Sequence, residues 1–146
     1  MEGPDGNGSD KRQDILFAPE SYKIKGACLT VYNKLGCGFL EKVYENALVH
    51  ELRKHGFTVD QQVPAKVVYD EVVVGDFFID LLIDKKFILE LKAVESDNPI
   101  FAAQLINYLK ATTLPLGFLV NFGMRSLFFK RIIFSKNSGN TLAIPD

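Results

Sequence analysis

The hydrophobic and polar positions in the first third of the chain predict two helices. Apolar residues recur every three or four positions over residues 21–35, and Gly36 follows, where a helix commonly ends. A second helix is expected over residues 39–55, because basic residues lie toward its end and Gly56 comes directly after it. The two helices are therefore expected to meet at a glycine-containing corner.

The middle of the chain predicts strands. Three short segments are rich in β-branched residues and are separated by turn residues; they cover residues 57–63, 66–69 and 72–74. Two further segments, residues 77–83 and 87–94, are more apolar, and the polar residues 84–86 lie between them. We expect these two segments to form a buried hairpin.

The last third of the chain predicts one helix and two strands. Asn98 and Pro99 are typical of a helix start, and the helix is expected to reach about residue 112. Strands are expected over residues 116–121 and 127–134. This order of elements predicts an α/β domain in which helices flank a mixed β-sheet.

Composition adds limits to this picture. The chain has 146 residues, of which 47% are hydrophobic, and this fits one globular domain. We expect the domain to cover residues 15–134, between a disordered tail at 1–14 and a flexible tail at 135–146. The apolar runs are too short to span a membrane, and Cys28 and Cys37 lack the spacing of a zinc site or a disulfide framework. A cytoplasmic location is expected.

A single carboxylate interrupts the apolar strand expected over residues 77–83. Asp80 is the only polar residue of that segment, and a buried carboxylate is costly unless something compensates its charge. In the partner strand, Glu90 and Lys92 are two residues apart and therefore lie on one face. The chemistry of the hairpin depends on whether Asp80 shares that face.

The length of the turn determines which face Asp80 occupies. With a three-residue turn, Ile83 lies opposite Phe87. Counting back along both strands then places Asp80 opposite Glu90, whereas a two-residue turn would put them on opposite faces. The three-residue turn therefore predicts that the two carboxylates and the lysine cluster on one side of the sheet.

Two carboxylates at this separation repel each other unless a proton or a cation lies between them, and hard divalent cations prefer oxygen ligands. The pair predicts a site for Mg²⁺ or Mn²⁺, with the backbone carbonyl of Leu91 as a third ligand. Lys92 is placed to orient a water molecule or to stabilise developing negative charge. The alternative is a structural ion pair of Lys92 with Asp80 or Glu90, and the spacing alone does not choose between them.

Two helices offer further candidates. Glu41 is expected on the apolar side of the second helix, although an acid in the first turn is also favoured by the helix dipole. In the third helix, Gln104 and Tyr108 are four residues apart and share one edge of the apolar face. Such a pair can contact a substrate or can simply pack and hydrogen-bond within the protein.

These candidates occur in a familiar arrangement. Residues 38–44 read Gly-Phe-Leu-Glu-Lys-Val-Tyr, and four further segments agree in order, around Asp80, Glu90, Gln104 and Asn121. Over roughly residues 21–134, the chain resembles the GxxExxY protein family, which is grouped with the PD-(D/E)XK nuclease-like superfamily. The proline in the superfamily's name is absent here, because Ile79 precedes the aspartate.

The resemblance implies a restriction-endonuclease-like core and a role for each candidate. Asp80 and Glu90 would bind Mg²⁺, Lys92 would be the catalytic lysine, and Glu41 would be the helix acid near the metal. The edge of the third helix would correspond to the QxxxY element of RecB-like nucleases, and would bind substrate.

The function favoured by the sequence is a Mg²⁺-dependent nuclease that acts on nucleic acid, with DNA ahead of RNA. The formal net charge of −1 neither requires nor excludes such a partner. One stretch without acids could contact phosphates or form a solvated edge; it contains Arg125, Lys130, Arg131 and Lys136.

Two other functions stay open. One is a non-catalytic module that binds nucleic acid or protein and retains the nuclease-like fold. The other is a small oligomeric enzyme or ligand binder, in which Phe101, Phe128 and Phe129 would serve an interface. A homodimer is compatible with each of these functions.

Overall fold

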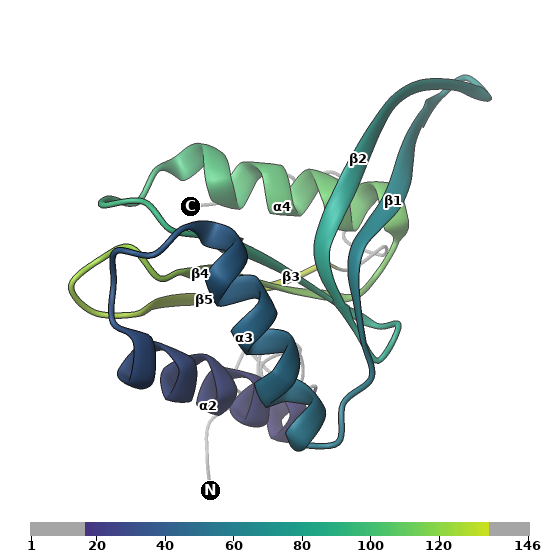
Figure 1. Ribbon diagram of the computed structural model, residues 1–146. Coiled ribbons are helices and arrows are strands. Elements are labelled where there is room, and N and C mark those ends of the chain that lie inside the picture. Colours follow the sequence, from purple (N-terminus) through teal and green to yellow (C-terminus); the bar gives the residue numbers. More distant parts are fainter. Residues whose placement is uncertain (1–16, 135–146) are drawn as a thin grey trace, which may run out of the picture.

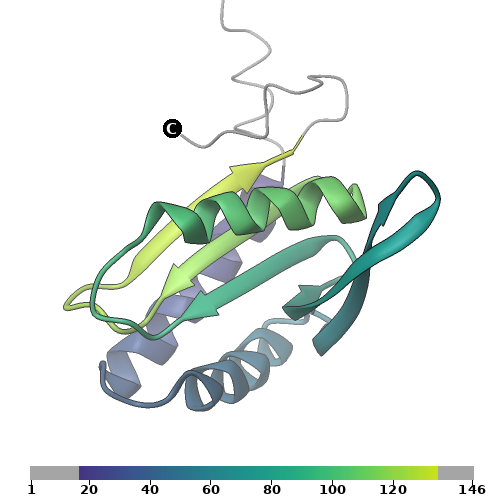
Figure 2. The same ribbon diagram turned by 90° about the horizontal axis from the view of Figure 1, so that it is seen from above.

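The computed structural model describes residues 17–134, which form three layers (Figure 1, Figure 2). A five-stranded sheet lies between helices α2 (Ala18–Leu35) and α3 (Glu41–Lys54) on one face and helix α4 (Pro99–Thr112) on the other. Each face has its own core of buried apolar side chains. The predicted α/β fold class is confirmed, and the tails predicted for 1–14 and 135–146 lie outside the described residues.

The strands follow the order of the chain across the sheet. They are β1 (Val59–Tyr69), β2 (Val72–Ile83), β3 (Phe87–Lys92), β4 (Leu116–Asn121) and β5 (Phe128–Ile133). Strands β3 and β4 pair in parallel, and the other neighbouring pairs are antiparallel. Parallel neighbours need a crossover connection, and α4 provides it. This helix consequently covers the sheet face that carries the candidate acids.

The start of α4 follows the predicted signals. Pro99 is its first residue, and the Asn98 side chain accepts a 3.0 Å hydrogen bond from the backbone N–H of Ile100. This bond satisfies a donor that has no partner within the helix. Leu105 and Leu109 are fully buried and attach the helix to the sheet.

The corner between α2 and α3 is held by Tyr44. Its hydroxyl donates to the carbonyl of Gly36 (2.6 Å) and accepts from the N–H of Phe39 (3.1 Å). The ring is buried and stacks on Phe122, with 4.7 Å between ring centroids. Gly38 has a φ of 115°, which glycine adopts readily and other residues rarely do. These contacts determine where α3 begins.

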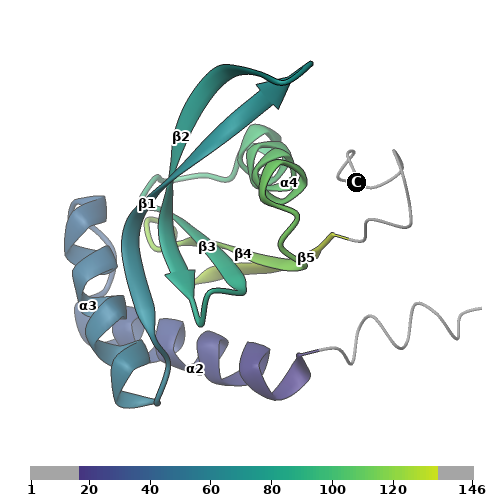
Figure 3. The same ribbon diagram turned by 90° about the vertical axis from the view of Figure 1, so that its right-hand side faces the viewer.

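Strands β1 and β2 extend beyond the rest of the sheet as a two-stranded arm (Figure 1, Figure 3). Strand β2 pairs with β3 through residues 81–83, so we define the arm as residues 64–79. The predicted short strands here are wrong, because pairs of segments join into single long strands. Pro64 is tolerated because β1 is an edge strand. Phe78, expected in a buried strand, is 58% exposed because it lies on the arm.

The ends of β3 and β4 are joined by a dense set of backbone contacts. The N–H of Phe122 donates to the carbonyl of Lys92 at 2.8 Å. The Oδ1 atom of Asn121 accepts from the N–H groups of Val94 (3.1 Å) and Gly123 (2.9 Å). A Cβ atom at Gly123 would collide with the backbone that it packs against. The chain is therefore fixed directly after Lys92.

No helix within residues 17–134 is long and apolar enough to cross a membrane. Both described cysteines are free; Cys28 is buried and Cys37 is exposed. Burial raises the pKa of the Cys28 thiol far above its usual range, so this thiol is unreactive.

Candidate active site

The hairpin of β2 and β3 has the predicted register. Residues 84–86 form the turn, and Ile83 pairs with Phe87, so the three-residue turn is confirmed. The paired residues of the two strands continue to Leu81 opposite Leu89. One step further along the same register, Asp80 and Glu90 come opposite each other.

At the position of Asp80 and Glu90, hydrogen bonds between backbone N–H groups and side chains take the place of the regular backbone hydrogen bonds between the strands. The N–H of Asp80 donates to Oε1 of Glu90 at 3.1 Å. The N–H of Leu91 donates to Oδ2 of Asp80 at 3.0 Å. Each carboxylate is therefore fixed by a backbone N–H of the opposite strand, and the two acids are held in contact.

The environment of Glu90 disfavours its charged form. Its side chain is buried, with 8% exposed. Burial raises the pKa of Glu90 to about 9, with smaller contributions from the charge of Asp80 and from a hydrogen bond between the two side chains. The charge of Lys92 opposes this rise. Without a cation, the pair thus holds a proton at neutral pH.

Lys92 lies on the same face as Glu90. Ile88 belongs to the core under α4, and residues two and four positions further along β3 project to the same side. The Nζ atom of Lys92 lies 4.7 Å from the ring centroid of Phe101 on α4, which is a cation–π distance. Its charge also lowers the pKa of Glu41. The ammonium group therefore interacts electrostatically with acids from both β3 and α3.

Glu41 is the first residue of α3 and follows the corner held by Tyr44. It precedes the buried Tyr44 and Leu48 by three and seven residues and so lies on the apolar side of α3, as expected, although its side chain is exposed at the start of the helix. Partial burial raises the pKa of Glu41, and the charge of Asp80 raises it further. The α2–α3 corner thus brings Glu41 within electrostatic reach of the hairpin acids.

Two residues that the sequence analysis did not single out connect α3 to Asp80. Glu45 is 2% exposed; its Oε2 accepts from Lys42 (2.9 Å) and Gln61 (2.8 Å), and its Oε1 accepts from Gln62 (2.9 Å). The same Nε2 of Gln62 donates to Oδ1 of Asp80 at 3.3 Å. One amide group thus bridges a buried acid of α3 and an acid of the candidate site.

The backbone of Gln62 is unusual. Its φ is 53°, in the left-handed region that a long side chain seldom adopts. The position lies between the ladder pairs Gln61–Leu81 and Val63–Ile79, directly opposite Asp80. Such strain is frequent at functional sites. The sequence shows only a run of three polar residues, Asp60, Gln61 and Gln62, in this strand, and that run does not indicate which residues Gln62 faces.

Helix α4 contributes an edge to the site. Phe101, Gln104 and Tyr108 are three and four residues apart and lie on one side of the helix. The Tyr108 ring stacks on Phe77 of the arm, with 4.0 Å between centroids. Partial burial raises the pKa of Tyr108, and the charges of Glu90 and Asp80 add to the rise. Tyr108 therefore borders the two acids, and Gln104 is exposed beside it.

The basic residues that were expected to contact phosphates do not form one patch in the structure. Arg131 pairs with Phe118 in the sheet and donates from Nε to the Ser21 hydroxyl of α2 at 3.1 Å, on the face opposite Glu90. Lys130 points to the α4 face from the edge strand β5, and Arg125 is exposed in the loop before it. Lys136 lies outside the described residues.

The aromatic residues suggested for an interface are half-buried. Phe101 and Phe128 pack against the core under α4, and Phe129 packs against the core under α2 and α3. They therefore contribute mainly to the two cores.

The donor set of the hairpin fits a hard divalent cation. Within residues 17–134, no three histidine, cysteine or carboxylate side chains are arranged to hold a metal by themselves. Mg²⁺, however, is commonly held by one or two carboxylates and completes its coordination with water and substrate. Asp80 and Glu90 supply two carboxylates in contact, and the buried Glu90 gains from a compensating positive charge.

Comparison with known proteins identifies the family. The model of the PD-(D/E)XK nuclease superfamily matches residues 18–132, and the chain belongs to this superfamily. The narrower GxxExxY family stays a prediction. No curated protein matches the chain. Among solved structures, the chain is similar to one described as "Crystal structure of SSO0001", with 16% identity and a TM-score of 0.48. The similarity covers 87% of this chain and 65% of that one.

Proposed function

We propose that the protein is a Mg²⁺- or Mn²⁺-dependent nuclease that hydrolyses phosphodiester bonds at Asp80, Glu90 and Lys92. The proposal rests above all on the contact between Asp80 and the buried Glu90, whose repulsion a divalent cation would relieve. Membership in the PD-(D/E)XK nuclease superfamily supports it.

Three groups would hold the cation. Asp80 and Glu90 supply carboxylate oxygens, and the Leu91 carbonyl supplies a third ligand. The N–H and C=O of a strand residue point to the same side, and the N–H of Leu91 already points at Asp80. A bound divalent cation supplies Lewis-acid stabilisation of the charge on the scissile phosphate.

The remaining groups act on the substrate directly. Lys92 would stabilise the negative charge that develops on the phosphate oxygens, while its contact with Phe101 keeps the ammonium on the site face. Glu41, exposed and with a raised pKa, is placed to accept a proton from the attacking water. Tyr108, whose raised pKa keeps the hydroxyl protonated, can donate a hydrogen bond to a phosphate oxygen. Gln104 lies beside it on the same helix edge.

The test is cleavage of labelled DNA and RNA with Mg²⁺, Mn²⁺ or EDTA. We expect cleavage that requires a cation and that is lost in Asp80→Asn and Glu90→Gln. Lys92→Met should lower the rate by about 100-fold or more, as expected when a group that stabilises transition-state charge is removed. Asp60→Asn is the control, because Asp60 is a partly exposed acid paired with Lys85 at 2.9 Å. Equal cleavage by Asp80→Asn and the parent would refute the site.

The alternative is a module that binds nucleic acid or protein without catalysis, which is motivated by the small size and near-neutral net charge of the chain. Such a module would bind oligonucleotides in EDTA but leave them intact in Mg²⁺. Its thermal unfolding would also be unchanged by divalent cations, whereas the nuclease is expected to be stabilised unless Asp80 is replaced. DNA is proposed as the substrate ahead of RNA, and light scattering would establish whether the active unit is a homodimer.

A further inference from the structure

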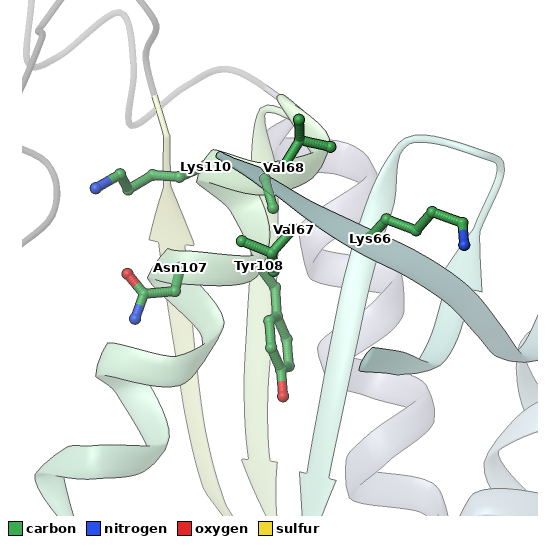
Figure 4. A pocket seen from close by; sticks show the side chains of 7 residues that line it. Lys66, Val67, Val68, Asn107, Tyr108 and Lys110 are labelled. Carbon is green, nitrogen blue, oxygen red and sulfur yellow. The ribbon is translucent and has the colours of Figure 1, made fainter. Parts of the chain in front are cut away.

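A groove of about 530 Å³ separates the arm from helix α4 (Figure 4). Lys66, Val67 and Val68 of strand β1 line one side. Helix α4 lines the other side with Asn107, Tyr108, Lys110 and Ala111. The groove exists because the arm continues past β3 and passes over α4, instead of lying flat in the sheet (Figure 3).

The groove adjoins the candidate active site. Tyr108 belongs to both, because it lines the groove and also senses the charges of Glu90 and Asp80. In Figure 4 the Tyr108 hydroxyl points away from the arm strand that carries Val67. The stack of Tyr108 on Phe77 holds the ring in this position. A ligand in the groove would therefore contact Tyr108, on the same edge of α4 as Phe101, whose ring lies 4.7 Å from the Nζ atom of Lys92.

The lining combines apolar surface with two cations. Val67 and Val68 are 41% and 59% exposed, which is high for valine on a strand. Figure 4 shows the Lys66 and Lys110 side chains pointing to opposite sides, with Val67 and Tyr108 between them. Lys66 makes one ion pair, 3.6 Å from Asp76, between side chains that are both mostly exposed, and such surface pairs are weak. Both ammonium groups are therefore accessible to a polyanion.

We propose that this groove binds a single-stranded stretch of the nucleic-acid substrate and leads it to Asp80 and Glu90. An unpaired base would contact the valines and the Tyr108 edge, the Asn107 amide would hydrogen-bond a base edge, and the two lysines would contact the flanking phosphates. The inference rests on the proposed nuclease function for the direction of the strand, but the binding itself requires no catalysis.

A single strand fits this lining better than a duplex or a protein. In a duplex the bases are stacked and paired, so the apolar wall between the lysines would face charged backbone. A protein segment would use the valines but would leave Lys66 and Lys110 without a specific role. Placement beside two acids that suit phosphodiester hydrolysis also favours a nucleic acid.

The experiment measures binding by fluorescence anisotropy in EDTA, where no cleavage can occur. The probes are a labelled single-stranded DNA, the RNA of the same sequence, and the blunt DNA duplex. The variant Lys66→Ala/Lys110→Ala is compared with Lys23→Ala/Lys34→Ala. The second variant removes the same charge from exposed positions of α2, on the opposite face of the sheet. All four positions are exposed, and thermal unfolding would verify that both variants fold.

We expect the parent to bind single strands more tightly than the duplex. The groove variant should bind them about tenfold more weakly, and its slope of log affinity against log salt should fall by about 1.4, for two phosphate contacts on a single strand. The α2 variant should behave like the parent. Equal losses in both variants would indicate nonspecific charge attraction and overturn the proposal, as would duplex binding as tight as single-strand binding.

The outcomes separate this inference from the proposed nuclease function. Specific single-strand binding without cleavage in Mg²⁺ would reject the nuclease and leave the groove assignment standing. Metal-dependent cleavage that is unaffected in the groove variant would support the nuclease and reject the groove assignment. Single-strand binding that is unaffected by the lysine changes would overturn the proposal.

Discussion

The amide nitrogen of Gln62 lies 3.3 Å from Oδ1 of Asp80, and the same nitrogen is 2.9 Å from the buried Glu45. A donor shared between two carboxylates fixes the direction of the Asp80 oxygen. Gln62 reaches this position with a strained backbone, at the point where β1 faces the acid. It is therefore a candidate positioning residue for the metal site.

Replacing Gln62 should weaken the metal site without unfolding the protein. We expect Gln62→Leu to lower the affinity for Mg²⁺ about 10-fold or more, as is typical when a partner of a metal ligand is lost. The measurement is calorimetry with Mg²⁺ or Mn²⁺. Gln62→Asn, which tolerates a positive φ and keeps the amide, should recover part of the affinity.

Gln61→Leu is the matched control for this prediction. Gln61 also donates to Glu45, and to Asn46 at 3.0 Å, whereas the bond to Asp80 comes from Gln62. Its replacement should leave metal affinity close to that of the parent. Similar losses in both variants would mean that the effect arises from Glu45, and Gln62 would then have no separate role.

Glu90 should make the metal-free protein less stable as the pH rises. Its pKa is about 9 in the fold against 4.5 in the unfolded chain, so the folded state binds more protons between these values. The stabilisation is complete below about pH 4.5 and is lost as the pH rises toward about 9. The side chain of Glu90→Gln stays neutral at every pH. At pH 8 we expect the free energy of unfolding of this variant to exceed that of the parent by on the order of 1–3 kcal/mol.

The test is urea unfolding in EDTA at several pH values. Near pH 5 the parent and Glu90→Gln should have similar free energies of unfolding, because both carry a neutral side chain there. If the free energies of unfolding of the two proteins changed with pH in the same way over the whole pH range, Glu90 would be ionised in the folded protein. Added Mg²⁺ should reduce the difference at pH 8, since it stabilises the parent's carboxylate alone.

Replacing Tyr44 should reduce stability, whereas replacing Glu41 of the same motif should mainly reduce cleavage. Tyr44→Phe leaves the Gly36 carbonyl and the Phe39 N–H without their partner in a half-buried corner, and should cost about 1–3 kcal/mol of stability. Glu41→Gln changes an exposed side chain and should alter stability by less than about 0.5 kcal/mol. Denaturant titration measures both effects. In a cleavage assay, Glu41→Gln should be the more damaging change at temperatures where both variants are folded.

Gly123→Ala should be strongly destabilising. Its Cβ would collide with backbone atoms after Lys92, which cannot move aside as the end of a side chain can. We expect a loss of about 2–3 kcal/mol. Gly26→Ala is the control, because that glycine lies on an exposed side of α2 with no atom within 4 Å of an added Cβ. This change should stabilise the protein by about 0.5–1 kcal/mol. A neutral Gly123→Ala would show that the two strand ends can separate.

Features determined by local chemistry could be predicted from the sequence. The turn at residues 84–86 and the alternation of β3 were enough to derive the register, and Asn98 marked the start of α4. Alternation would also have shown that Lys130 and Arg131, as neighbours in a strand, point to opposite faces. The expected basic patch overlooked this rule.

The rest of the site depends on contacts between residues distant in the chain. Nothing near Gln62 reveals that it faces both Glu45 and Asp80, because that requires β1, β2 and α3 to be in place. The arm also could not be predicted from the sequence, because it too depends on contacts between distant residues. Its exposed valines have the same composition as a buried strand, and only the early end of β3 leaves them without a neighbour.

The ends of β3 and β4 are joined by backbone atoms and by the side chain of Asn121 alone, so few substitutions there could shift Lys92. Variation in this protein's lineage would therefore act on the arm and on α4, where substitutions meet solvent, while the reacting groups keep their places. Substrate preference could then diverge among related proteins without any alteration of the acids and the lysine.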